Sequence, residues 1–127
     1  MSDTPEPTAF AAEWIEAWNA RDVERVLAHY AEEVEFTSPT ARRFAPRSEG
    51  RVRGKAALRQ YWITALAANP DLRFELIDVY AGVDTIVLHY RNQAGGLVNE
   101  VLNFRDGVVH TGHATHVCAP VDRSPPA

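Results

Sequence analysis

The second half of the chain alternates between apolar and polar residues in four runs, and this pattern limits the possible folds more than any other feature. The runs cover residues 72–80, 85–91, 97–104 and 108–117. The connections between them are short and carry turn residues, and connections of this kind join neighbouring antiparallel strands. The sequence therefore predicts an antiparallel meander over this half.

The first third of the chain has helical periodicity instead. Phe10, Trp14 and Trp18 recur every four residues and form one apolar stripe, and Thr8 is a plausible N-cap. Asp22 is predicted to cap a second, shorter helix that runs to about Tyr30, before a short strand over residues 34–37. A third helix is predicted from apolar residues on one face between Ala57 and Leu66, closed by Asn69-Pro70. Helices followed by a meander predict an α+β fold, in which the helices cover one face of a curved sheet.

Residues 39–53 show neither periodicity and are predicted to form a long loop. This segment contains five arginines (Arg42, Arg43, Arg47, Arg51 and Arg53). Long loops inside a compact domain are often binding loops, so the arginines are candidates to clamp an anionic ligand. The alternative is a solvated loop that balances the acidic first third of the chain.

Length and composition narrow the possible classes of protein. The 127 residues suit one domain, predicted over residues 8–118, with flexible tails at 1–7 and 119–127. The net charge of −4 does not favour a nucleic-acid partner, and no apolar run approaches the roughly 20 residues that span a membrane. The single cysteine excludes an internal disulfide, and we expect a cytoplasmic protein because no secretory signal is visible.

Alternation along the predicted strands separates an inner face from an outer face. The even-numbered positions are the apolar ones and should meet the helices: Ile86, Leu88, Tyr90, Val98, Leu102 and Phe104. Glu100 is the exception on this face. A carboxyl group among apolar side chains is costly unless it is paired, hydrogen-bonded or neutral, so Glu100 is a candidate general acid or base. The alternatives are that Glu100 is solvated at the edge of the sheet or pairs with an arginine of the long loop.

The turn at Asp106-Gly107 decides which residues of the last strand lie near Glu100. A three-residue loop would turn Gly112, Ala114 and His116 inward, with Gly112 opposite Glu100. The two small residues would then leave volume for a pocket. A two-residue loop would bring His113 beside Glu100 instead, and the sequence leaves both possibilities open.

Three histidines, His110, His113 and His116, are spaced three residues apart near the end of the chain. Positions three apart on a strand face opposite sides, so one metal ion cannot bind all three, and no metal site is predicted. His116 alone could exchange protons near neutral pH, or it could be a partly exposed structural residue.

Six tyrosines and tryptophans are a large share of one small core: Trp14, Trp18, Tyr30, Tyr61, Trp62 and Tyr90. Plain packing explains some of them. Aromatic walls with a few polar groups are also what a pocket for a small molecule needs. The polar tips of Tyr30 and Trp62 make them candidates to hydrogen-bond a ligand.

Four stretches together resemble SnoaL-like proteins, which belong to the nuclear-transport-factor-two-like superfamily with ketosteroid isomerase and limonene epoxide hydrolase. These stretches are Trp14–Asp22, His29–Phe36, Gly50–Leu58 and Asn103–Val109. The resemblance implies an α+β cone of three N-terminal helices on a curved, mostly antiparallel sheet of the cystatin type. It also implies a pocket between helices and sheet, and a homodimer formed through the outer sheet face.

The resemblance also suggests roles for individual residues. The catalytic aspartate of ketosteroid isomerase falls on Ser38, and its oxyanion tyrosine falls on Trp14. A supporting tyrosine is kept as Tyr30, another falls on Trp62, and the protonated acid of the oxyanion site falls on Glu100.

In the last strand, a pocket tryptophan of the isomerase falls on His116. Polyketide cyclases and the epoxide hydrolase place an essential acid where this chain has Ala114. The chain therefore lacks the base of each of these well-known branches.

Two functions are compatible with these observations. The first is a cofactor-free isomerase, cyclase or dehydratase acting on a small hydrophobic molecule, with Glu100, His116 and Tyr30 as catalytic residues. The second is a non-catalytic binding protein or a dimeric accessory domain. In either case the predicted ligand-binding residues are Trp14, Trp18, Ser38, Trp62, Tyr90, Leu102, Gly112 and Ala114.

Overall fold

The four-residue spacing of aromatic residues forms helix α1 (Pro7–Asn19), which buries Phe10, Trp14 and Trp18. The carboxylate of Glu6 caps this helix by accepting hydrogen bonds from the backbone N–H groups of Thr8 and Ala9, at 3.2 and 2.7 Å. The predicted cap at Thr8 is therefore wrong, since Pro7 already occupies the first helical turn. These details come from a computed structural model that describes residues 3–118.

Two further helices follow the predicted pattern. Asp22 caps α2 (Val23–Leu27), as predicted, by accepting from the backbone N–H of Arg25 at 3.1 Å. Helix α4 (Lys55–Ala68) starts after Gly54 and buries Tyr61 and Trp62. In the part of the chain that the structure describes, no helix is long and apolar enough to cross a membrane.

Residues 39–53 are not the long loop that the lack of periodicity predicted. They form helix α3 (Pro39–Phe44), the 3₁₀ turn η1 (Pro46–Ser48) and strand β2 (Arg51–Arg53). The Oγ atom of Ser38 caps α3 by accepting from the backbone N–H of Thr40 at 3.1 Å. A helix of six residues depends on its cap and first proline rather than on an apolar repeat, so periodicity could not show it.

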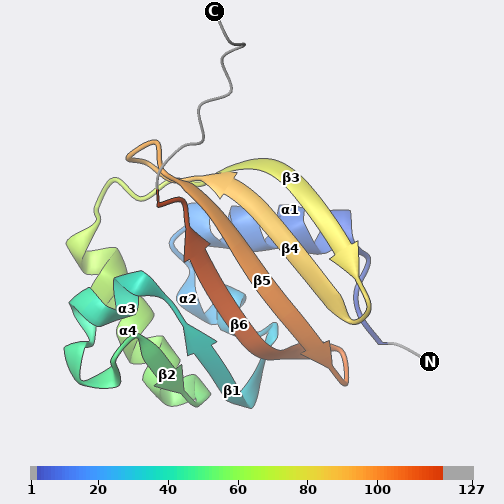
Figure 1. The fold of residues 1–127 in the computed structure, drawn as a ribbon, viewed down its shortest axis with the longest axis horizontal. Coiled ribbons are helices and arrows are strands. Elements are labelled where there is room, and N and C mark those ends of the chain that lie inside the picture. The colour runs from blue at the N-terminus through green and yellow to red at the C-terminus, as the bar shows by residue number, and fades with distance from the viewer. Residues whose placement is uncertain (1–2, 119–127) are drawn as a thin grey trace, which may run out of the picture.

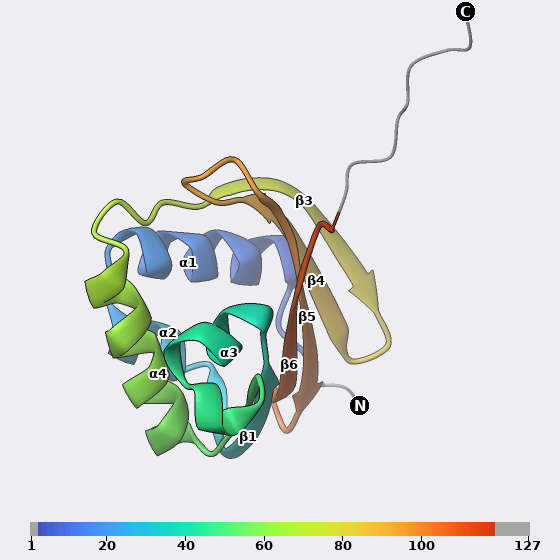
Figure 2. The ribbon, with the colours of Figure 1, turned by 60° about the vertical axis from the view of Figure 1, so that its left-hand side comes forward.

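Six strands of the described chain form one curved sheet in the order β2-β1-β6-β5-β4-β3 (Figure 1). The strands besides β2 are β1 (Tyr30–Thr37), β3 (Glu75–Gly82), β4 (Thr85–Arg91), β5 (Leu97–Arg105) and β6 (Val108–His116). Strands β3 to β6 make the predicted antiparallel meander, while β1 pairs with β6 in parallel. The helices cover one face of the sheet (Figure 2), which confirms the predicted α+β architecture.

The last hairpin has the two-residue loop of the two that the sequence left open, but not the register that this loop alone would give. Asp106 and Gly107 both have positive φ, 54° and 82°, and form a two-residue turn that pairs Arg105 with Val108. The register then shifts at His110, which is the extra residue of a β-bulge between paired positions. Beyond the bulge the parity is the one that the three-residue loop would have given, so Gly112, Ala114 and His116 share the inner face with the even-numbered residues of β5, whereas before the bulge the inward residue is Val109.

The register places Ala114 opposite Glu100, and Gly112 opposite Leu102. Both predictions for the neighbour of Glu100, Gly112 or His113, are therefore wrong. A Cβ atom on Gly112 would lie 3.0 Å from the Phe36 ring. The missing side chain at Gly112 thus admits an aromatic ring instead of leaving a hollow.

Candidate functional site

The helices and the inner sheet face enclose a cavity of about 340 Å³. Helices α1, α3 and α4 contribute to its wall, as do β1, β4, β5 and β6. Its aromatic lining consists of Trp14, Trp18, Phe36, Phe44, Tyr61, Trp62, Phe74 and Tyr90. The volume and lining are typical of a site for a small, largely apolar molecule.

Glu100 lies in this wall with 5% of its surface exposed. Its Oε1 atom accepts a hydrogen bond from the Tyr90 hydroxyl at 2.8 Å, and Oε2 has no hydrogen-bond partner within residues 3–118. Burial raises the pKa of Glu100 to about 7, although the bond from Tyr90 acts in the opposite direction. The carboxyl group is neither solvated at the sheet edge nor paired with an arginine, so it can hold or release a proton near neutral pH.

Rings from α1, α4, β4 and the connection before β3 pack against one another around the cavity. The ring centroids of Trp18 and Trp62 are 4.9 Å apart in an edge-to-face arrangement, and those of Phe74 and Tyr90 are 4.4 Å apart. Aromatic contacts of this kind stabilise a defined geometry beyond the burial of area. These contacts therefore fix the positions of the aromatic side chains that surround Glu100.

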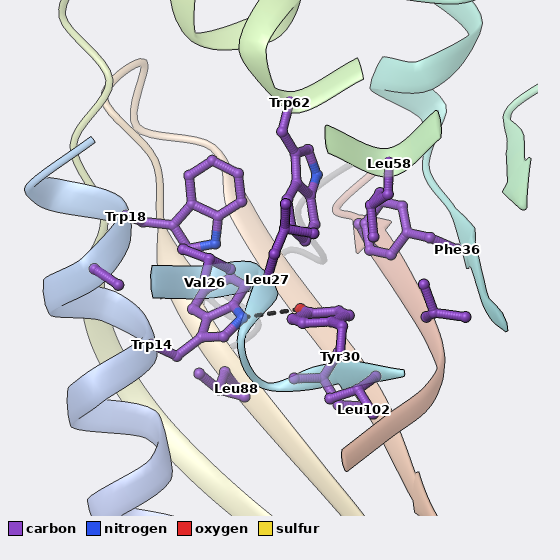
Figure 3. Packing of buried hydrophobic residues seen from close by; sticks show 14 of the residues in the cluster. Trp14, Trp18, Val26, Leu27, Tyr30, Phe36, Leu58, Trp62, Leu88 and Leu102 are labelled. Atoms are coloured by element: carbon purple, nitrogen blue, oxygen red, sulfur yellow. Dashed lines mark hydrogen bonds between the residues drawn. The ribbon is translucent and has the colours of Figure 1, made fainter. Parts of the chain in front are cut away.

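Tyr30 was predicted to be a catalytic residue that hydrogen-bonds the ligand, but it does not line the cavity. It is almost fully buried behind the cavity lining, and its hydroxyl accepts a hydrogen bond from the Trp14 indole N–H at 3.0 Å (Figure 3). Burial raises the pKa of Tyr30, with a further contribution from the nearby charge of Glu100. Tyr30 therefore supports Trp14 from behind and does not border the cavity.

Four predicted site residues of β5 and β6 separate into two groups. Ala114 and His116 line the cavity, whereas Gly112 and its neighbour Leu102 do not, because Phe36 packs on Gly112 and Leu102 is fully buried. Partial burial lowers the pKa of His116, so its imidazole is neutral at physiological pH.

The hydroxyl of Ser38 also borders the cavity, but its oxygen already caps α3. No group of three or more potential metal ligands comes together in residues 3–118. His113, for example, points its Nδ1 atom at the Thr37 hydroxyl, 2.7 Å away.

Sequence reasoning missed several residues of the cavity: Phe44, Leu72, Phe74, Asn92 and Gln93. Phe44 belongs to α3, and the Ser38-Pro39 pair is the signal that could have revealed this helix. Leu72 and Phe74 belong to the predicted run 72–80 but precede β3, which begins only at Glu75. Asn92 and Gln93 lie in the connection between β4 and β5, where no periodicity indicates which way a side chain points.

Three polar atoms of lining residues are buried without a hydrogen-bond partner in the described chain. They are Trp18 Nε1, Gln93 Oε1 and Glu100 Oε2. Buried polar groups in proteins are almost always satisfied, by water or by a bound molecule where the chain does not provide a partner. Because three such atoms line one cavity, we expect a molecule in the cavity to supply their hydrogen-bond partners.

The model of the SnoaL-like domain family matches residues 11–119. A SnoaL-like protein of unknown function from Burkholderia thailandensis is 41% identical, with a TM-score of 0.82 over 88% of this chain and 99% of that one. TerC, co-crystallised with polyporic acid, is 15% identical (TM-score 0.72, 88% and 92% covered). A proposed polyketide cyclase from Sinorhizobium meliloti is 12% identical (TM-score 0.70, 91% and 100% covered).

The two more distant structures show the fold alone. No curated protein matches the chain. The family match covers most of the chain, and the Burkholderia thailandensis structure agrees with it in sequence and in fold. The chain therefore belongs to the family of SnoaL-like domains.

Proposed function

We propose that the cavity binds a small, largely apolar molecule and that Glu100 exchanges a proton with it, without a cofactor. The observation that carries this proposal is the carboxyl group itself. One of its oxygens is fixed by Tyr90, the other has no partner in the described chain, and its pKa is about 7. A general acid or base works best when its pKa lies near the operating pH.

The aromatic wall supports the same role. A substrate that enters the cavity displaces water from Glu100, which strengthens electrostatic interactions between the carboxylate and the reacting atoms. The Trp18 indole N–H has no hydrogen-bond partner among residues 3–118 and can donate to an oxygen of the bound molecule. The site thus combines a proton carrier, a hydrogen-bond donor and rings that orient a flat ligand, as required for isomerase- or lyase-type chemistry.

Proton exchange can be tested without knowing the natural substrate. The protein is incubated in D₂O with a small aromatic ketone such as 2-tetralone, and loss of its acidic C–H signals is followed by NMR. We expect Glu100→Gln to slow the exchange by about 100-fold or more, the usual range for removal of a general base. Glu33→Gln is the matched control, because it makes the same substitution at an exposed carboxylate of β1 that does not line the cavity.

A non-catalytic binding role is the second candidate. It is favoured by the absence of a second carboxyl group among the described lining residues, and by the capping role of the Ser38 hydroxyl. Wild-type protein that binds the ketone but exchanges its protons no faster than Glu100→Gln would support binding without chemistry.

We also propose that the outer sheet face joins two copies of the chain. This face carries a mixture of groups suited to an interface: Val87, His89, Asn99, Val101, Asn103, Thr111, His113 and Thr115. At the edge of the sheet, 56% of the Tyr80 surface is exposed. Light scattering at micromolar concentration should give the mass of a dimer, and the mass of one chain would contradict the proposal.

A further inference from the structure

The cavity lining contains one side chain with a permanent positive charge among the described residues, Arg43 of α3. The Arg43 side chain is exposed, and its guanidinium carbon lies 5.3 Å from the centroid of the Phe44 ring, which lines the same cavity. This contact holds the charged group against the aromatic wall. Arg43 therefore stands where the cavity meets solvent.

The other arginines of residues 42–53 have different surroundings. Arg51 donates to Glu35 at 2.6 Å, and Arg53 lies 3.9 Å from the same carboxylate. Arg42 borders a neighbouring hollow with Glu49, which shares Ser38 and Ala114 with the main cavity, but Arg42 does not line the main cavity itself. Arg47 is exposed and lines neither of them. The structure thus selects one member of the cluster for the main cavity.

The charge of Arg43 is not balanced by the protein. No carboxylate within residues 3–118 lies within 4.0 Å of its guanidinium group. The only carboxyl group that lines the cavity among these residues is Glu100, which is buried and bonded to Tyr90. A guanidinium group binds carboxylates strongly because it offers two parallel N–H donors.

We propose that the ligand is an amphipathic organic acid whose flat apolar body lies among the tryptophans and whose carboxylate binds Arg43. This inference rests on the proposed binding function of the cavity and specifies the class of its ligand. The overall charge of −4 does not prevent it, because salt screens distant charges beyond about 8 Å while Arg43 acts at contact distance.

The test compares two probes that differ in charge. Calorimetric titration with 2-naphthoate and with its neutral methyl ester is carried out on the wild type, Arg43→Gln and Arg43→Lys. Arg42→Gln is the matched control, since Arg42 is the adjacent arginine and lies outside this cavity. We expect Arg43→Gln to weaken binding of 2-naphthoate about tenfold, the scale of one exposed charge-assisted hydrogen-bonded pair, and to leave the ester unaffected.

Arg43→Lys should retain part of the preference for the acid, and Arg42→Gln should change neither affinity. The inference is overturned if Arg43→Gln weakens both probes equally or neither of them, while binding of the ester shows that the cavity still takes up apolar molecules. If the wild type binds neither probe, both the inference and the proposed binding function are wrong.

Discussion

Two residues on the inner face of β5, Leu102 and Glu100, are separated by one position and lie in opposite surroundings. Each faces a small residue of β6, Gly112 or Ala114. Beside Leu102 the space is filled, because Phe36 packs where a Gly112 side chain would be. Beside Glu100 the space is part of the cavity.

The comparison shows that a small residue in a sheet does not by itself create a pocket. The outcome depends on whether another element supplies a ring to fill the volume, as β1 does with Phe36. The inner face therefore has a solid half, which contains Leu102 and Val109, and a hollow half, which contains Val98, Glu100 and Ala114.

The largest expected effect concerns the charge in the hollow half. The pKa of Glu100 is about 7 in the folded protein against an ordinary value of 4.5, so the folded state holds the proton more tightly than the unfolded state. The stability from this proton is complete below pH 4.5, falls as the pH rises toward 7 and is absent above it. We expect Glu100→Gln to raise the free energy of unfolding by about 3 kcal/mol at pH 8 and to change it little at pH 4.5.

Urea unfolding at both pH values checks this prediction, and Leu102→Met serves as a control that adds no titratable group. An equal effect of Glu100→Gln at pH 4.5 and pH 8 would show that the carboxyl group does not bear the cost of burial.

The next prediction compares the loss of stability caused by a valine-to-alanine substitution in the solid half and in the hollow half of the inner sheet face. Val109 is fully buried in the solid half, whereas Val98 lines the cavity. Val109→Ala should lower the free energy of unfolding by about 2 kcal/mol, because it opens a new void. Val98→Ala should cost only about 1 kcal/mol, since it enlarges a cavity that already exists. Equal losses in urea unfolding would mean that the two halves do not differ in packing.

A third prediction adds volume instead of removing it. Gly112→Ala should lower the free energy of unfolding by about 1 kcal/mol, because the new methyl group would lie 3.0 Å from Phe36 and 3.2 Å from Leu102. Ala114→Val should be nearly neutral for stability and should weaken binding of 2-naphthoate, since the added methyl groups enter the cavity. Thermal unfolding measures the stability of both variants, and calorimetric titration measures the binding of 2-naphthoate. A larger loss of stability for Ala114→Val than for Gly112→Ala would refute the conclusion that the space beside Ala114 is open.

The smallest effect sharpens the description of Glu100 itself. Tyr90→Phe removes the hydrogen bond to Oε1, which favours the ionised form, so the pKa of Glu100 should rise further. Tyr30→Phe is the control, because its hydroxyl bonds to Trp14 and not to Glu100. Infrared titration of the carboxyl band measures the pKa of Glu100 in both variants. An unchanged or lower pKa in Tyr90→Phe would contradict the hydrogen bond between Tyr90 and Glu100.

Alternation along the strands was enough to predict which residues face inward, including Glu100. It could not predict the bulge at His110, which depends on the twist of the hairpin and on the partner strand. Nor could it show that Phe36 fills one half of the inner face, because that contact joins residues 76 positions apart along the chain. The chemical character of the site was therefore readable from the sequence, whereas its exact position required the tertiary contacts.

The placement of β6 has a consequence for how the protein is made. This strand is the last of the sheet to leave the ribosome, yet it lies in the middle, between β1 and β5. Until it arrives, β1 has no partner on that side, and the nascent helices have only part of a surface to cover. Pairing over such long separations is slow to form, so folding must wait for nearly the whole domain to be synthesised.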